Sequence, residues 1–155
     1  MALDPRRPPG TPGEVTVDAA ALVDAPTVQW LVERLRECCA VVGRPVSRLS
    51  VRLIGDAEMD QLHQRHSGIA GTTDVLTFVE CSEPVAADLA VCWDVAGREA
   101  AARGLPERLE ALLYCLHGLL HACGWDDAQP EQAALMHKEQ DRILSLIAGN
   151  ASSSS

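Results

Sequence analysis

Apolar residues follow two different spacings along the chain. In several segments they recur every three or four positions, which is typical of helices with one buried face. Shorter runs rich in Val, Leu and Ile predict strands. We therefore expect helices over residues 27–42, 57–66, 95–103, 106–123 and 131–147. We expect strands over residues 14–17, 49–54, 73–80 and 88–94, with a turn at 82–84.

The order of these elements predicts an α+β fold. Strands and helices alternate until the last two helices follow each other, which is typical of a small mixed β-sheet covered by helices. The length of 155 residues fits one domain, which we place at residues 13–149. Residues 1–12 are rich in proline and glycine and predict a disordered arm. Residues 150–155 are serine-rich and predict a flexible tail.

Side-chain directions and helix ends follow from the same patterns. Asp56 is expected to cap the helix over 57–66, and Pro106 to lie in the first turn of its helix. The residues expected to face inward from the last helix are Leu135, Ile143 and Leu144. In the strand over 73–80, Val75 is expected to face away from Leu76 and Phe78.

The most informative helix ends at Gly124 and carries two histidines. Its apolar stripe consists of Leu109, Leu112, Leu116, Leu119 and Cys123, widened by Leu113 and Leu120. At about 100° per residue, His117 and His121 fall on another face, one turn apart. Gly124 then ends the helix, because glycine readily adopts a left-handed conformation. The turn allows Asp126 and Asp127 to approach the histidines.

Two imidazole nitrogens and one carboxylate oxygen form the ligand set of a catalytic zinc site with one open position. The alternative interpretation is that His117 and His121 are ordinary, partly buried histidines, because this spacing alone is common. A zinc peptidase is excluded, because its H-E-x-x-H motif needs a glutamate where this chain has Gly118. Cys123 belongs to the apolar stripe, and we interpret it as a core residue.

Four segments, in the same order, resemble a known family. HGLLHACGWDD, residues 117–127, resembles the H-G-x-L-H-x-x-G-Y-D-H signature of the YbeY-type endoribonucleases. GTTDVLTFVE, residues 71–80, resembles that family's T-D-V-L-S-F strand, and DLAVCWDVAGREA, residues 88–100, resembles its next strand and helix. The last helix matches the family pattern at Met136, Glu139, Ile143 and Leu144. The resemblance covers residues 45–147.

This resemblance implies a metal-dependent endoribonuclease that cuts single-stranded RNA in ribosomal RNA maturation and ribosome quality control. His117, His121 and Asp127 would act through one Zn²⁺ per chain, with Asp126 as an alternative ligand or a hydrogen-bond partner of a histidine. The implied partners are ribosomal RNA and the small ribosomal subunit or its assembly factors, with no membrane and no DNA. The implied location is the cytoplasm.

Three departures from the family pattern concern activity. Asp127 stands where the family has a third histidine ligand. Ser67 stands where the family has an arginine implicated in catalysis, and Ile69 and Ala70 replace a lysine and an aspartate. Arg65 is a candidate for a displaced guanidinium. The alternative function is therefore a catalytically weak or inactive ribosome-assembly or RNA-binding module of the same fold.

Two further interpretations have less support. Two histidines and a carboxylate also form the facial triad of non-haem iron enzymes, but no oxygenase motif accompanies them here. His63 and His66 lie at the end of the helix over 57–66, and we interpret them as exposed polar residues rather than ligands. His137, on the last helix, is also expected to be exposed.

The net charge and the cysteine content limit the ligands and the redox environment that we expect for this chain. The net charge is −9, which disfavours non-specific binding to polyanions. Among the 13 basic residues only Lys138 is a lysine, and arginine suits bidentate phosphate contacts. The six cysteines include no C-x-x-C pair, so we expect reduced core thiols. No apolar run is long enough to span a bilayer, and no export signal is recognisable.

Overall fold

A mixed sheet forms the centre of the computed structural model, which describes residues 13–69 and 71–153. Its four strands are β1 (Glu14–Asp18), β2 (Val46–Ile54), β3 (Val75–Ser82) and β4 (Val85–Cys92), in the order β1-β2-β4-β3. β1, β2 and β4 run parallel, whereas β3 pairs antiparallel with β4 through a short hairpin. The predicted α+β class and mixed sheet are confirmed.

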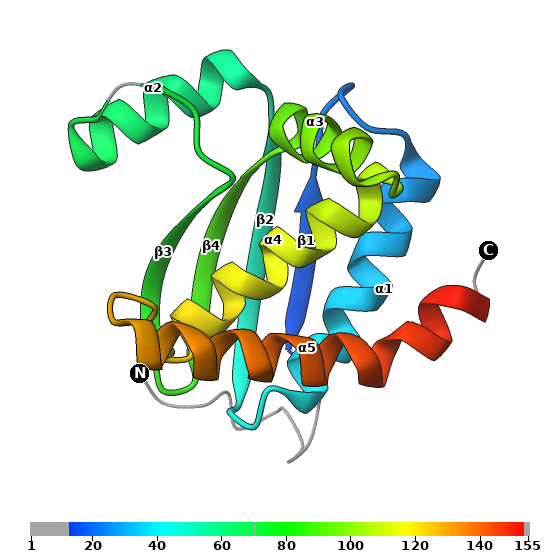
Figure 1. Cartoon of the computed structure of the whole chain (residues 1–155), viewed down its shortest axis with the longest axis vertical. Coiled ribbons are helices and arrows are strands. Elements are labelled where there is room, and N and C mark those ends of the chain that lie inside the picture. The colour runs from blue at the N-terminus through cyan, green and yellow to red at the C-terminus, as the bar shows by residue number, and fades with distance from the viewer. Residues whose placement is uncertain (1–12, 70, 154–155) are drawn as a thin grey trace.

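Five helices pack around this sheet within the described residues. They are α1 (Ala25–Val41), α2 (Asp56–Ser67), α3 (Trp93–Arg103), α4 (Glu107–Ala122) and α5 (Pro130–Ser153). In Figure 1, α4 crosses in front of the sheet and α5 lies across the lower end, while α2 stands apart at the upper left. No helix in the described part of the chain is long and apolar enough to cross a membrane.

The two faces of the sheet bury different clusters. Leu49, Val51, Leu89 and Val91 belong to the large core that also contains the apolar stripe of α4 and much of α1. A smaller cluster on the other side joins Leu76, Ala90 and Met59 of α2, with Phe78 packed against it. Val75 packs against the large core instead. The strand alternation predicted for 73–80 is therefore confirmed, because successive side chains of a strand point to opposite faces.

Glycine at position 118 allows α4 to approach the sheet closely. A methyl group added there would lie 2.9 Å from Leu89 Cδ2 and 3.1 Å from Thr77 Oγ1. Both distances are shorter than normal contacts between these atoms, so only a residue without a side chain fits without movement. Gly118, whose identity excludes a zinc-peptidase motif, thus also sets the distance between α4 and the β3–β4 hairpin.

Several predicted boundaries and directions are wrong in detail. Gly55, not Asp56, is the N-cap of α2, and the Asp56 side chain pairs with Arg98 instead. Pro106 is the N-cap of α4 rather than part of its first turn. Leu135 is 60% exposed, whereas Ile143 is buried and Leu144 packs against the core as expected.

Predictions were also made for the ends of the chain and for the cysteines. α5 continues to Ser153, so the segment expected to be a tail from residue 150 is helical to that point. The arm predicted at residues 1–12, the end of the tail at residues 154–155 and Ala70 lie outside the described residues. All six cysteines are free thiols, as predicted, and all except Cys81 are buried.

Candidate metal centre

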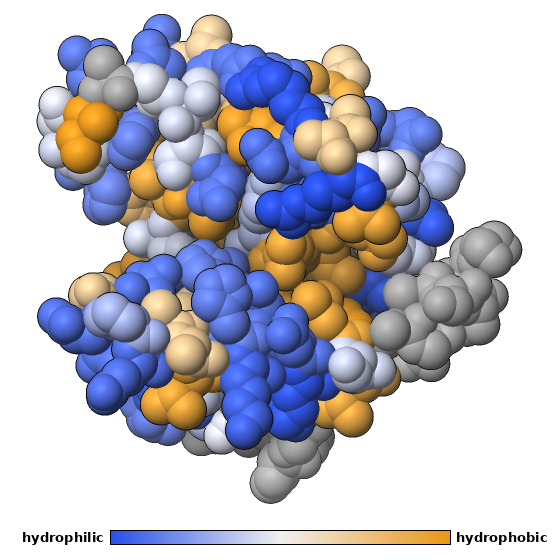
Figure 2. Space-filling view, in the orientation of Figure 1, coloured by the Kyte–Doolittle hydropathy of each residue, from blue (hydrophilic) through white to orange (hydrophobic). Residues whose placement is uncertain are grey.

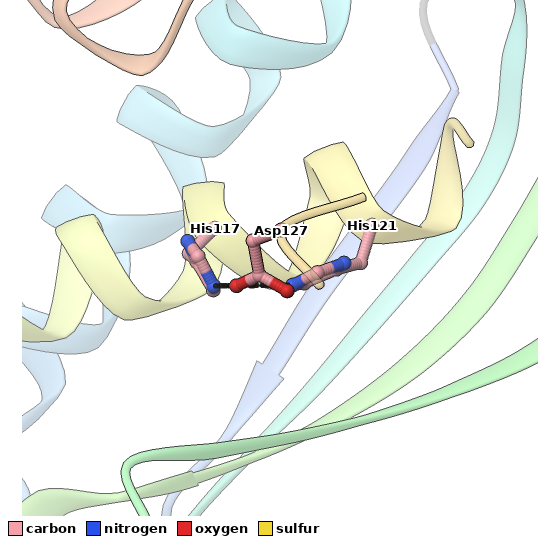
Figure 3. Close-up of side chains that lie close together, drawn as sticks. All are labelled: His117, His121 and Asp127. Atoms are coloured by element: carbon pink, nitrogen blue, oxygen red, sulfur yellow. Dashed lines mark hydrogen bonds and ion pairs between the residues drawn. The ribbon is translucent and has the colours of Figure 1, made fainter. Parts of the chain in front are cut away.

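Three potential metal ligands converge at the C-terminal end of α4. The Nε2 atoms of His117 and His121 lie 3.1 Å apart, and Asp127 Oδ2 lies 3.4 Å from each of them. Asp127 enters from the loop after α4 and points between the two rings (Figure 3). Within the described residues these three form a group of His, Cys, Asp or Glu that could hold one ion.

The spacing of these atoms fits a small tetrahedral cation. Ligand atoms bound about 2.0–2.1 Å from zinc with tetrahedral geometry lie about 3.3–3.4 Å apart. The three observed separations, from 3.1 to 3.4 Å, are close to this value. Side-chain exposures of 26% for His117, 30% for His121 and 43% for Asp127 leave the group open to solvent on one side. The residues present therefore fit zinc with a position left for another ligand.

Hydrogen bonds on the far side of each ring fix which nitrogen faces the other ligands. His117 Nδ1 lies 3.2 Å from Gln140 Oε1 on α5, and His121 Nδ1 lies 3.1 Å from the Trp125 carbonyl oxygen. Both oxygens can accept a hydrogen bond from an Nδ1–H, which is the tautomer that leaves Nε2 unprotonated. Each Nε2 then presents a lone pair toward Asp127, as a metal ligand must.

The loop that carries Asp127 is held by its backbone and by Arg44. Gly124 has φ = 100°, a conformation that glycine adopts without strain, and it turns the chain after α4 as predicted. Arg44 Nη1 donates to the Cys123 carbonyl at 2.6 Å, and Nη2 donates to the Ser82 carbonyl at 2.7 Å. One guanidinium thus ties the end of α4 to the β3–β4 hairpin.

The Asp126 side chain forms a hydrogen bond within the loop and is not part of the candidate ligand group. Its Oδ1 accepts a hydrogen bond from the Ala128 backbone N–H at 3.0 Å, which closes a local turn. Asp127, not Asp126, lies within reach of the two histidines. Of the two carboxylates that the sequence offered, the structure brings Asp127 to the site.

Comparison with known proteins identifies the family of this chain. The model of the family described as Endoribonuclease YbeY matches residues 19–148, which is most of the chain. The chain belongs to the YbeY family. Curated proteins named Endoribonuclease YbeY from Frankia alni and Aromatoleum aromaticum are each 37% identical to it, over 114 and 102 residues. The one from Mycobacterium tuberculosis is 34% identical over 113 residues.

These matches to YbeY proteins cover part of each chain. They take in 64 to 65% of this chain and 63 to 66% of the three relatives, so the chain spans less than two thirds of their length. A solution structure of a Thermotoga maritima protein shares the fold with a TM-score of 0.60. It is 24% identical, and the alignment covers 91% of this chain and 96% of that one.

The departure from the YbeY pattern at Ser67 lies on α2, away from the departure at Asp127. Ser67 is exposed at the end of this helix, where its hydroxyl donates to the His63 carbonyl at 2.8 Å. Arg65 is exposed on the same helix, and no contact among the described residues links it to the three ligands. α2 covers the sheet face opposite α4, so sequence proximity to β3 did not bring Arg65 to the histidines.

The other histidines take no part in the group. His63 Nδ1 lies 3.1 Å from the Gly71 carbonyl, and the ring of His66 meets Phe78 edge-on with centroids 4.8 Å apart. His137 is exposed on α5, as predicted. The site residue that sequence reasoning missed is Gln140, which is 6% exposed on the buried side of α5. Its position four residues after Met136 and three before Ile143 was the available signal.

Proposed function

We propose that this chain is a zinc-dependent endoribonuclease that cuts single-stranded RNA during ribosomal RNA maturation and ribosome quality control. One observation carries the proposal: the two signature histidines and Asp127, which stands where the family has a third histidine, present three ligand atoms at tetrahedral spacing on an exposed surface. The names of the YbeY relatives support RNA as the substrate class. The proposed partners are ribosomal RNA and the small subunit or its assembly factors, in the cytoplasm.

Each residue has a distinct task in this proposal. His117 and His121 hold the ion through neutral Nε2 atoms, whose direction is fixed by the hydrogen bonds at Nδ1. Asp127 contributes the third ligand atom and one negative charge. Zinc bound there supplies a Lewis acid that polarises a phosphoryl oxygen and lowers the pKa of a bound water.

The aspartate in place of the family's third histidine lowers the expected activity. A carboxylate makes the ligand set one charge unit more negative than a neutral imidazole, which weakens attraction for a phosphate. Ser67 also supplies no positive charge where the family has an arginine. These two residues favour a second candidate function, a weakly active or inactive RNA-binding module of ribosome assembly with the same fold.

The zinc content of variants distinguishes Asp127, the proposed ligand, from its neighbour Asp126. We expect the purified chain to hold nearly one zinc per molecule by elemental analysis, and Asp127→Asn and His121→Ala to lose most of it. Asp126→Asn is the matched control, because the amide oxygen can still accept from the Ala128 N–H, and it should keep its zinc. Equal zinc in the two aspartate variants, or none in the parent chain, contradicts the proposed site.

Cleavage of a labelled single-stranded RNA then separates the two candidate functions. We expect slow, zinc-dependent cleavage by the parent chain and faster cleavage by Asp127→His, because the ligand set becomes less negative. Arg65→Ala with an unchanged rate removes Arg65 from the candidate catalytic residues. Zinc bound at full occupancy without cleavage by the parent or by Asp127→His favours the binding module.

A further inference from the structure

A cavity lies at the upper end of the contact between α4 and β3. Its volume is about 460 Å³, and the residues that matter for its chemistry are Thr72, Asp74, Arg98, Glu99, Arg103 and Tyr114. This volume is within the range of small-molecule binding sites. The cavity also lies where the parallel strand β4 ends and α3 begins, and ligands of sheet proteins commonly bind at such strand ends.

The cavity and the metal centre share two elements. Tyr114 precedes His117 by three residues on α4, a rise of about 4.5 Å along the helix axis. Asp74 immediately precedes β3, whose Thr77 lies against Gly118 farther along the same helix. Figure 2 shows the surface hollowed between the part formed by α2 and α3 and the part formed by α5. The cavity and the candidate metal centre therefore lie within about one turn of each other along α4.

One wall of the cavity carries a guanidinium held by a buried carboxylate. Arg103 Nη1 donates to Glu110 Oε1 at 2.9 Å, and the Glu110 side chain is only 2% exposed. Arg103 itself is half exposed, so its other N–H groups remain accessible to a ligand. Burial raises the pKa of the Tyr114 hydroxyl, and the nearby Glu110 carboxylate raises it further, so this hydroxyl stays protonated. A ligand thus meets donors that are already oriented.

The charges in and behind the cavity exclude a phosphate as its occupant. Each guanidinium is already paired, Arg103 with Glu110 and Arg98 with both oxygens of Asp56. Asp74 and Glu99 add two further carboxylates to the lining. Carboxylates therefore outnumber guanidinium groups, and an additional anion would be repelled. A neutral group with both hydrogen-bond donors and acceptors matches this lining instead.

We infer that this cavity binds the nucleoside next to the scissile phosphate, through hydroxyl groups of its ribose. A ribose hydroxyl donates to the Glu99 or Asp74 carboxylate and accepts from the Arg103 guanidinium, which a deoxyribose lacking the 2′-hydroxyl cannot do fully. The 2′-hydroxyl is the group by which proteins distinguish RNA from DNA. This inference rests on the proposed RNA substrate, and it assigns the choice of ribose over deoxyribose to Arg103 and Glu99.

The test compares a fluorescein-labelled short oligouridylate with its 2′-deoxy counterpart. Binding is measured by fluorescence anisotropy on the full chain after metal removal, so that cleavage does not interfere. The variants are Arg103→Gln and Glu99→Gln, with Arg36→Gln on α1 and Glu14→Gln on β1 as controls, both exposed and outside the cavity. Glu99→Gln keeps the test valid if Arg103→Gln unfolds the chain by leaving Glu110 without its partner.

We expect the parent chain and both controls to bind the ribose form about tenfold more tightly, the effect of one hydrogen bond to a charged group. Both cavity variants should lose most of this preference and bind the deoxy form as the parent does. Equal affinity of the parent for the two forms, no binding of either, or an unchanged preference in Glu99→Gln overturns the inference. Cleavage with zinc is followed separately, so ribose preference without cleavage contradicts the proposed nuclease while the cavity assignment stands.

Discussion

Gln140 supports one ligand ring of the candidate metal site from a neighbouring helix. It is nearly buried, and its side-chain oxygen accepts from His117 Nδ1. We expect Gln140→Leu to weaken zinc affinity about 10- to 100-fold, because His117 loses the partner that fixes its tautomer. Zinc affinity measured by competition with a chelating dye checks this.

A control variant and a rescue variant distinguish the effect of His117 orientation from an effect on the packing of α5. Gln132→Leu makes the same change at an exposed position of α5 and should leave affinity unchanged. Gln140→Glu retains an oxygen acceptor and should keep affinity near that of the parent chain. If Gln140→Leu and Gln140→Glu bind zinc equally well, the hydrogen bond to His117 has no role in holding the ion.

At this scale the sequence indicated the candidate group better than the residues that support it. His117 and His121 are recognisable because helical spacing is a local property of the chain, and the glycine turn brought Asp126 and Asp127 into consideration. Asp127 was preferred over Asp126 through the family resemblance. The bond from Gln140 joins residues 23 positions apart, and nothing in the local pattern selects it. The same holds for Leu135, which helical spacing alone did not distinguish from Met136 as the buried residue.

Among the elements, the contact of α4 with the hairpin depends on one small residue. We expect Gly118→Ala to destabilise the chain by about 1–3 kcal/mol, the usual effect of forcing an extra carbon into a packed interior. The methyl group would lie 2.9 Å from Leu89 Cδ2, so the buried Leu89 side chain or α4 must shift. Urea unfolding followed by circular dichroism measures the free energy of unfolding.

Gly97 in α3 provides a matched control, for which we expect the opposite change in stability. A methyl group there would lie 3.6 Å from the Glu107 side chain, which is an ordinary contact. Gly97→Ala should therefore stabilise the chain by about 0.5–1 kcal/mol through the higher helix propensity of alanine. Destabilisation by both variants would mean that the short distance at Gly118 is not the cause.

The sequence predicted which helices and strands are present, but not the side-chain contacts that link them. Helical periodicity identified α1, α4 and most of α5, because burial of one face repeats every three or four residues. The cap of α2 shows the limit: Asp94, on α3, accepts from the Asp56 backbone N–H at 2.8 Å. A local rule assigned this task to Asp56, whereas a residue 38 positions away performs it.

For the molecule as a whole, buried thiols predict how stability depends on pH. Burial raises the pKa of Cys39 and of Cys115 to about 12, from the ordinary thiol value of 9.0. The unfolded chain therefore loses these protons at lower pH than the folded one. The stability that they contribute is complete below pH 9 and is lost as the pH rises toward 12.

We expect the free energy of unfolding to fall steadily above pH 9, by as much as about 1.4 kcal/mol per pH unit for each buried thiol. Urea titrations at a series of pH values measure this slope, and Cys115→Ala should reduce it by the share of one thiol. An unchanged slope in Cys115→Ala would show that other groups cause the alkaline loss. The slope, rather than the stability at neutral pH, is the quantity compared, because the alanine variant also leaves a cavity.

Strand order is the property of the whole molecule that the sequence did not contain. A mixed sheet was predicted, but nothing local places β4 between β2 and β3. This order puts the start of β3 beside the end of β4, where α3 and α4 meet. The cavity lined by Asp74 and Tyr114 lies at this junction and was not foreseen.

The clearance at Gly118 also limits how this fold can evolve. Two of the four glycine codons differ from a glutamate codon by a single base, so a zinc-peptidase motif is only one or two base changes from the sequence between His117 and His121. The base change would not be sufficient, because the new side chain would begin against Leu89 and point into the sheet. A glutamate at this position would need a shift of Leu89 or of α4 as well, so the packing at Gly118 is a second barrier to a peptidase motif in this fold.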